Sequence, residues 1–227
     1  MSAWLYPILT EKLVALADFA DVAATLADLG VERIQLRLKA TNDRDAVLLY
    51  AAVADRLARW SGTLVVNDRA DLAWLLARHS RSRGHAHRVG LHLGQTDLPI
   101  EAARAIVGDD VAIGLSTHDI AQLQAALATS CDHVAFGPVF GTSTKDNPDP
   151  VVGISLLAQA AVMARAHARP LVAIGGIDAS NVAAVLYAGA SSLAVIGALF
   201  QDGPTGLPDR VARLIAVASL ELTRSPT

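Results

Sequence analysis

Short apolar runs alternate along the chain with longer stretches in which apolar residues recur every three or four positions. The first longer stretch has this helical spacing at Leu16, Phe19, Val22, Leu26 and Leu29. The short runs predict strands at residues 5–9, 33–36, 63–66, 89–93, 111–115, 133–136, 171–174 and 193–196. Strands that alternate with helices in this way predict an α/β fold with a parallel sheet, which eight units can close into a (β/α)8 TIM barrel. An open doubly wound sheet is the alternative.

Composition agrees with one such barrel over residues 1–227, because no repeat or low-complexity linker divides the chain. Apolar residues make up 52% of the chain and charged residues 18%, which excludes disorder and suits strands buried on both faces. The net charge of −3 provides no overall attraction to nucleic acid or anionic membranes. We recognise neither a signal peptide nor a bilayer-spanning run, and therefore expect a cytoplasmic protein. The single cysteine, Cys131, is expected to be a buried packing residue.

Catalytic groups of a TIM barrel lie at the carboxyl ends of its strands. The second predicted strand leads into Gln35, Arg37 and Lys39, which the alternation of a strand places on one side. Two cations and an amide suit an anionic ligand that carries a ring rich in heteroatoms. A solvated strand end is the alternative interpretation.

Two carboxylates follow neighbouring strands. Asp68 comes after Asn67 at the end of the third predicted strand, and Asp97 follows the fourth. Each could cap a helix when considered alone. Together they could share one Mg²⁺, which proteins usually hold with one or two carboxylates, substrate phosphate oxygens and water. Further helix starts are expected at Asp43, His118 and Asp178.

Neutral anion donors follow the later strands. Ser116, after the fifth strand, either donates to a phosphate oxygen or caps the next helix. The long connection after the sixth strand is suited to covering a ligand, although an ordinary surface loop would look the same. Its donors are Thr142, Ser143, Thr144 and Lys145. Glycines after the seventh and eighth strands, at positions 175, 176 and 197, allow backbone N–H groups to approach a phosphate. The charged region suits a metal-bound diphosphate, and the glycine-rich region suits a monophosphate.

One basic segment, residues 78–88, departs from the regular pattern. It predicts a solvated loop between the third helix and the fourth strand, on the face opposite the active site. Adventitious metal binding by His85 and His87 is one alternative, although no third ligand is identifiable. Nucleic-acid contact is another, weakened by the absence of interleaved aromatic residues.

Six motifs in this chain resemble those of the thiamine-phosphate synthase family. They are QLRLK at 35–39, NDR at 67–69, HLGQTD at 92–97, STH at 116–118, GPVF with TSTK between 137 and 145, and AIGGI at 173–177. They occur in family order and cover most of the chain from residue 5 to about 200. The resemblance implies a transferase that joins a hydroxymethylpyrimidine diphosphate to a thiazole phosphate. The products would be thiamine phosphate and pyrophosphate, formed through a pyrimidine carbocation that requires no strong protein base.

The resemblance also implies a role for each matching residue. The pyrimidine diphosphate would contact Gln35, Arg37, Lys39, Asn67, Ser116 and Lys145. The catalytic residues among these would be Arg37, Lys39, Ser116 and Lys145. The thiazole phosphate would contact Thr142, Ser143, Thr144, Gly176, Ile196 and Gly197. Asp68 and Asp97 would bind Mg²⁺.

Two positions depart from the family pattern. Glu11 follows Thr10 where the family usually has aspartate, and Gly197 replaces a common serine, which removes one expected hydroxyl contact. A thiazole tautomerase on the same fold is the nearest alternative function, but it does not need the diphosphate site that Lys39, Lys145 and the two carboxylates suggest. A sugar-phosphate epimerase or aldolase and a non-catalytic barrel that binds thiamine precursors are further alternatives.

Overall fold

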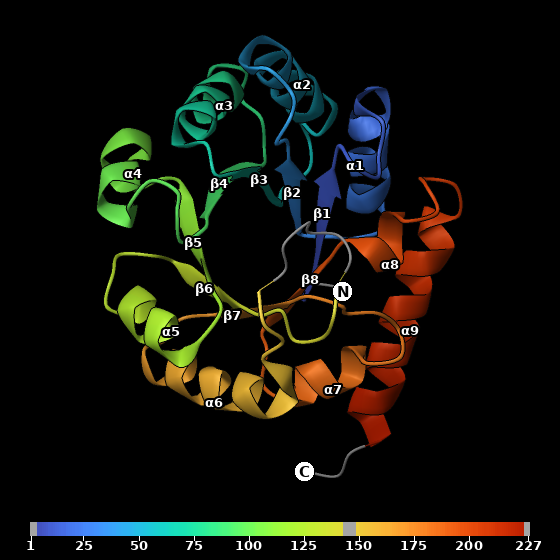
Figure 1. The fold of residues 1–227 in the computed structure, drawn as a ribbon. Coiled ribbons are helices and arrows are strands. Elements are labelled where there is room, and N and C mark those ends of the chain that lie inside the picture. The colour runs from blue at the N-terminus through green and yellow to red at the C-terminus, as the bar shows by residue number, and fades with distance from the viewer. Residues whose placement is uncertain (1–3, 143–148, 225–227) are drawn as a thin grey trace.

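Eight parallel strands form a closed barrel inside a ring of helices (Figure 1). The computed structural model describes residues 4–142 and 149–224. The strands are β1 (Leu5–Thr10), β2 (Arg33–Arg37), β3 (Thr63–Asn67), β4 (Arg88–Leu93), β5 (Ala112–Thr117), β6 (His133–Phe136), β7 (Leu171–Ile174) and β8 (Ser192–Val195). Each pairs with the next, and β8 pairs with β1. The predicted TIM barrel is therefore confirmed, and the open sheet is excluded.

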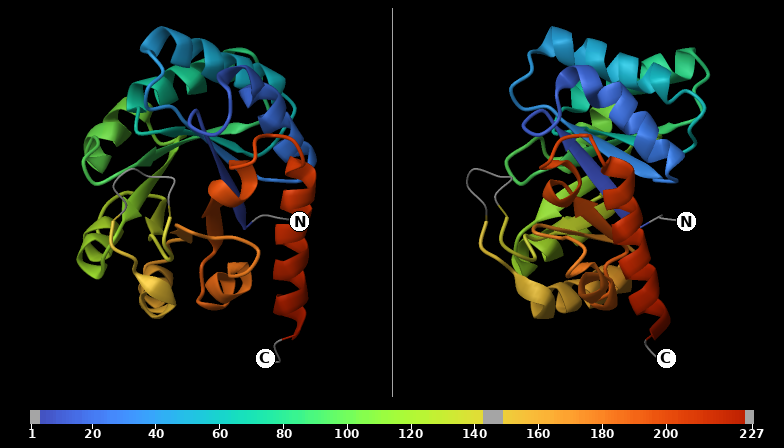
Figure 2. Two further views of the ribbon diagram at one scale, coloured as in Figure 1. Left: turned by 45° about the vertical axis from the view of Figure 1, so that its right-hand side comes forward. Right: turned by 90° about the vertical axis from the view of Figure 1, so that its right-hand side faces the viewer.

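The helices follow the strands in the predicted alternation and cover the outside of the barrel. They are η1 (Leu16–Asp18), α1 (Phe19–Asp28), α2 (Asp43–Arg56), α3 (Ala70–Ser82), α4 (Ile100–Val107), α5 (Ile120–Leu127), α6 (Gly153–Ala166), α7 (Val182–Tyr187), α8 (Gly197–Phe200) and α9 (Leu207–Arg224). Figure 2 shows the long α9 lying along the outer side of the barrel, where it packs against α7 and α8.

The strands separate two layers of buried side chains. Tyr6 and Ile8 of β1 point into the barrel, whereas Leu5 and Leu9 point out towards the helices, as the alternation of a strand requires. The inner layer consists of Tyr6, Ile8, Val65, Ala135, Val172 and Ala194. The outer layer is much larger and contains Cys131, which is buried as expected. Burial on both faces explains why the strands are apolar runs without strict alternation.

Three of the predicted helix starts, those at Asp97, His118 and Asp178, are wrong. The carboxylate of Asp97 accepts a hydrogen bond from the N–H of Gly94 at 2.7 Å, and α4 begins only at Ile100. Next to His118, it is Asp119 that caps α5. Asp178 lies four residues before α7, whose N-cap is Asn181. In these loops the capping geometry depends on where the chain turns, which residue type alone does not determine. Asp43 does begin α2.

The predicted solvated loop at residues 78–88 is only partly correct, because its arginines are exposed but the segment is neither wholly a loop nor wholly solvated. Helix α3 extends to Ser82, and His87 is buried, with Nε2 3.0 Å from the Ser80 hydroxyl. His85 Nε2 lies 3.3 Å from a carboxylate oxygen of Asp55 on α2. Polar partners on α2 and α3 thus make burial of these imidazoles possible. Within the described residues, no three His, Cys, Asp or Glu side chains converge to hold a metal ion.

The helices of the described segments have one further property in common. None of them combines the length and the apolarity that crossing a membrane requires.

Candidate active site

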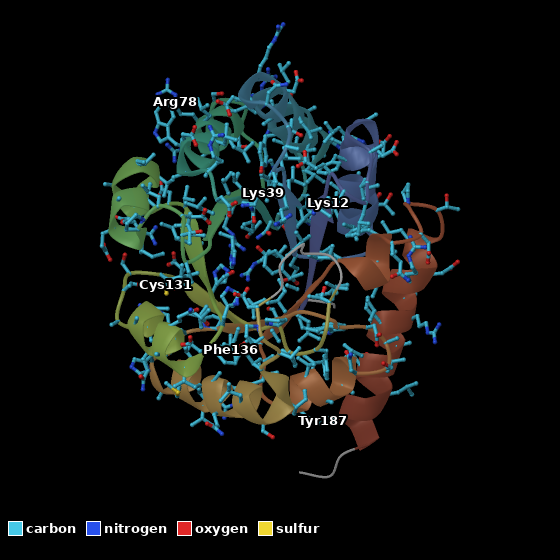
Figure 3. The ribbon with its side chains drawn as sticks, viewed as in Figure 1. Lys12, Lys39, Arg78, Cys131, Phe136 and Tyr187 are labelled. Atoms are coloured by element: carbon cyan, nitrogen blue, oxygen red, sulfur yellow. The ribbon has the colours of Figure 1, made fainter. Side chains whose placement is uncertain are left out.

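The carboxyl ends of the strands surround a cavity of about 880 Å³, within the range of small-molecule sites. Every predicted site residue that the structure describes lines it: Gln35, Arg37, Lys39, Asn67, Asp68, Asp97, Ser116, Thr142, Gly176, Ile196 and Gly197. Ser143, Thr144 and Lys145 lie outside the described residues, so their roles stay predictions. Figure 3 shows Lys39 near the barrel centre, whereas Arg78 and Tyr187 lie on the outer helices.

The carboxylates of Asp68 and Asp97 form an acidic pair at the mouth of the cavity, next to Lys39. The ammonium group of Lys39 forms an ion pair with Asp68. Burial raises the pKa of Asp68, and the neighbouring Asp97 carboxylate raises it further against the opposing effect of Lys39. A partly desolvated carboxylate beside a second one favours binding of a divalent cation, which would relieve their repulsion. The donor set therefore fits Mg²⁺.

Backbone geometry brings the carboxylates of Asp68 and Asp97 together at the cavity wall. Asp68 has a φ of 63°, in the left-handed region that few residues other than glycine adopt. Its N–H donates to the carbonyl oxygen of His92 at 2.7 Å, which ties the end of β3 to β4. Asp97 is oriented by the Gly94 N–H described above. Strained backbone of this kind concentrates at functional sites, which agrees with the position of Asp68 on the cavity wall.

Sequence reasoning missed His92, which lines the cavity from β4. Its Nε2 lies 2.8 Å from the hydroxyl oxygen of Ser116 on β5. Burial lowers the pKa of His92 to about 4, so the imidazole is neutral at pH 7. A histidine between Leu91 and Leu93, in an otherwise apolar strand, was the available signal. Asp119 caps α5, so the Ser116 hydroxyl is not a helix cap and belongs to the cavity.

Tyr6 also lines the cavity, and the sequence did not identify it because it lies within β1 and not at a strand end. Its hydroxyl accepts a hydrogen bond from the side-chain amide of Gln35 at 2.8 Å. The guanidinium of Arg33 lies 5.3 Å from the centre of the Tyr6 ring. Burial raises the pKa of Tyr6, so the phenol stays protonated. Gln35 is thereby held in one orientation below Arg37 on β2.

His118 joins two loops at the rim of the cavity. Its Nδ1 lies 2.6 Å from the carbonyl oxygen of Gly137, and its Nε2 lies 3.5 Å from a carboxylate oxygen of Asp149. The ring thereby connects the end of β5 with the residues on both sides of the β6–α6 connection. His118 lines the cavity but does not cap α5, because Asp119 does.

The paired glycines after β7 have a structural reason that differs from the expected one. Gly175 and Gly176 adopt φ values of 100° and 63°. A Cβ atom on Gly176 would lie 2.4 Å from the carbonyl oxygen of Gly141, and one on Gly175 would lie 2.4 Å from Pro138. The glycines thus allow the loops after β6 and β7 to pack together. Both also line the cavity, where their backbone is open to a ligand.

Comparison with known proteins places these features in one family. The model of the thiamine monophosphate synthase family matches residues 5–199. The thiamine-phosphate synthase of Koribacter versatilis is 40% identical over 188 residues, which is 83% of this chain and 82% of that protein. The thiamine-phosphate synthase of Methanoculleus marisnigri is 39% identical over 215 residues, covering 92% of this chain and 95% of that protein.

A solved structure supports the same fold. The thiamine phosphate pyrophosphorylase from Pyrococcus furiosus superposes with a TM-score of 0.78, covering 97% of this chain and 98% of that chain at 24% identity. The matched family region contains every strand of the barrel and the described residues of the cavity that sequence reasoning selected. The chain therefore belongs to the thiamine monophosphate synthase family and is a transferase of thiamine biosynthesis.

Proposed function

We propose that this enzyme joins a hydroxymethylpyrimidine diphosphate to a thiazole phosphate, with Mg²⁺ held at Asp68 and Asp97. The observation that carries the proposal is the acidic pair beside Lys39, at one side of a cavity whose other side is rich in glycine. A metal-bound diphosphate needs the first environment, and a phosphate that stays attached to its ring needs the second. Both lie within one cavity of about 880 Å³.

The charged side is suited to a leaving pyrophosphate. Breaking the C–O bond of the pyrimidine diphosphate leaves negative charge on the phosphate oxygens. Arg37 and Lys39 line the cavity on β2 and just beyond it, where donors positioned in advance stabilise charge as it develops. A bound Mg²⁺ would supply further positive charge to the same oxygens. Lys39 would then interact less strongly with Asp68 and would bind the diphosphate in addition.

The inner wall is suited to the pyrimidine ring. Gln35, Asn67 and Ser116 present amide and hydroxyl groups, which recognise ring nitrogens and an amino group by hydrogen bonding. Because burial keeps His92 neutral, no imidazolium charge opposes a carbocation that forms beside it. The protein groups here bind and orient the ring, and none of them has to remove a proton.

The glycine-rich side is suited to the thiazole phosphate. Thr142, Gly176, Ile196 and Gly197 line it. The short helix α8 begins at Gly197, directly after β8. Loops after the seventh and eighth strands, with a short helix, are the usual phosphate site of TIM barrels. Ser143 and Thr144 are assigned to this side, and Lys145 to the diphosphate side, by sequence alone.

The test is a product assay with purified protein, both substrates and Mg²⁺, with and without a chelator. We expect equal amounts of pyrophosphate and thiamine phosphate, and no product after chelation. Asp97→Asn should lower turnover strongly, whereas Asp71→Asn should not, because Asp71 pairs with Arg69 outside the cavity. Full turnover in the presence of chelator would overturn the metal assignment.

Other outcomes of the same assay separate the alternative functions. Isomerised thiazole phosphate without pyrophosphate would indicate a tautomerase, and tight binding without product would indicate a precursor-binding protein. The partners implied by the proposal are these two small molecules, and a cytoplasmic location remains a prediction.

A further inference from the structure

The carboxylate of Glu11, just beyond β1, is bound by a row of donors from the β2–α2 connection. Its Oε1 accepts hydrogen bonds from the backbone N–H groups of Lys39 and Ala40, the latter at 2.5 Å. Its Oε2 accepts the N–H of Thr41 at 3.0 Å and the Thr41 hydroxyl. Three successive N–H groups that converge on one anion form a backbone nest, and here a side chain of the same protein occupies it.

Electrostatics keep this carboxylate ionised. Burial opposes ionisation of Glu11, but the hydrogen bonds from Thr41, Ala40 and Lys39 outweigh it and hold its pKa below the usual value. Hydrogen bonds to an ionised acceptor are about twice as strong as neutral ones. The contact joins positions 28 to 30 residues apart, so it fixes the connection to the barrel wall.

The hydrogen bonds from residues 39–41 to Glu11, here called the clamp, have a specific position relative to the active-site cavity. Glu11 itself does not line the cavity. Thr10 pairs with Arg37 in the barrel, and the clamped backbone begins two residues later, at Lys39. Beyond the clamp, Asn42 caps α2. The backbone of Lys39 is therefore held while its ammonium group reaches Asp68.

We infer that Glu11 is a positioning residue that holds Lys39 at the diphosphate side of the cavity. The inference rests on the proposed function, which assigns Lys39 to the leaving pyrophosphate. A lysine side chain is long and flexible, and a fixed backbone reduces the conformational freedom that it loses on binding an anion. Glu11 acts through Lys39 and touches no substrate.

The decisive experiment is a double-mutant cycle between Glu11→Gln and Lys39→Met. Binding of inorganic pyrophosphate with Mg²⁺ is measured by calorimetry, and steady-state kinetics give KM for each substrate. The glutamine amide turns an NH₂ group towards N–H donors, so Glu11→Gln should weaken pyrophosphate binding and raise the diphosphate KM by about tenfold. The KM for thiazole phosphate should stay constant. In the Lys39→Met background, Glu11→Gln should have little further effect.

A matched control and a second variant separate positioning from general destabilisation. Glu101 also accepts a backbone N–H and a hydroxyl, both from Ser130, and does not line the cavity. Glu101→Gln should therefore leave both KM values unchanged. Amide exchange at residues 39–41 should accelerate in Glu11→Gln only. Thr41→Val removes one donor to Glu11 and should raise the diphosphate KM by a smaller factor. This variant tests the inference if Glu11→Gln does not fold.

The outcomes distinguish the inference from the function on which it rests. Wild-type protein without pyrophosphate release would refute the proposed function. Active wild-type protein whose Glu11→Gln and Thr41→Val variants keep the wild-type diphosphate KM would overturn the inference. Additive losses in the cycle would do the same, because they would show that Glu11 does not act through Lys39.

Discussion

Acidification is expected to destabilise the barrel through two imidazoles that lie inside it. The rings of His92 on β4 and His133 on β6 are buried, with their centres 5.8 Å apart. Burial, with a smaller contribution from Arg33, lowers the pKa of His92 to about 4. The same causes, together with His92, lower the pKa of His133 well below its usual value. Both rings are therefore neutral in the folded protein at pH 7.

The sign and size of the effect follow from linkage. The pKa of His92 falls from 6.5 in the unfolded chain to about 4 in the folded protein, so the unfolded chain takes up the proton first as the pH falls. The contribution to stability is complete above pH 6.5 and is lost progressively down to pH 4. At about 1.4 kcal/mol for each pH unit, the loss is about 3 kcal/mol. Protonation of His133 acts in the same direction.

Urea unfolding followed by circular dichroism, between pH 7 and pH 4, measures this loss. Carboxylates also titrate in this range, so the informative quantity is the difference between wild type and His92→Asn at each pH. Wild type should lose about 3 kcal/mol more than the variant over the interval. His167→Asn is the control, because His167 is exposed at the end of α6. Equal pH dependence of wild type and His92→Asn would refute the reasoning.

Two further substitutions test the packing of the β7 loop and an ion pair on the barrel. Gly176→Ala combines a positive φ with a Cβ position 2.4 Å from a backbone oxygen, and should lower Tm by at least about 3 °C. Gly30→Ala has a positive φ but no neighbour within 4 Å, so an equal loss in both would contradict the packing argument. Arg104→Met removes an ion pair with Asp132 at 2.7 Å and three contacts to backbone oxygens, and should cost about 2–3 kcal/mol in urea unfolding. The Arg104 side chain is 17% exposed, whereas that of Arg81 is 67% exposed. Arg81→Met should therefore cost less than about 1 kcal/mol, and the reverse order would refute the argument that burial strengthens the Arg104 contacts.

The strands and their closure were predictable because their signal is local. Each strand is a short apolar run, and the predicted runs differ from the observed strands by at most one residue at either end, except that β5 extends two residues beyond its predicted end. Residues on the carboxyl side of such runs share one rim of a barrel, so Gln35, Asp68 and Asp97 could be assigned to one cavity before their distances were known. The physical basis is the alternation of side chains along a strand combined with the common direction of parallel strands.

Polar residues inside the barrel and at the loop contacts were harder to predict. His92 and Tyr6 lie within strands whose other residues indicate only core packing. Their partners, Ser116 and Gln35, come from other strands. The environment of His87 depends on Ser80 and on α2, which makes a basic segment partly helical and buried. Such contacts depend on which elements become neighbours, and residue type provides only the capacity to form them.

Lys39 shows which features follow from the sequence and which follow only from the tertiary structure. Its place after the second strand, among residues that suit an anion, follows from the amino-acid order alone, as do the element types and the apolar layers. Its partners follow from closure of the barrel, which brings Asp68 from β3 and Glu11 from β1 to the same short connection. Local pattern selects strands and helices because burial depends on spacing along the chain. Ionisation, orientation and partner choice depend on distances between strands, and these exist only after the eight strands have closed.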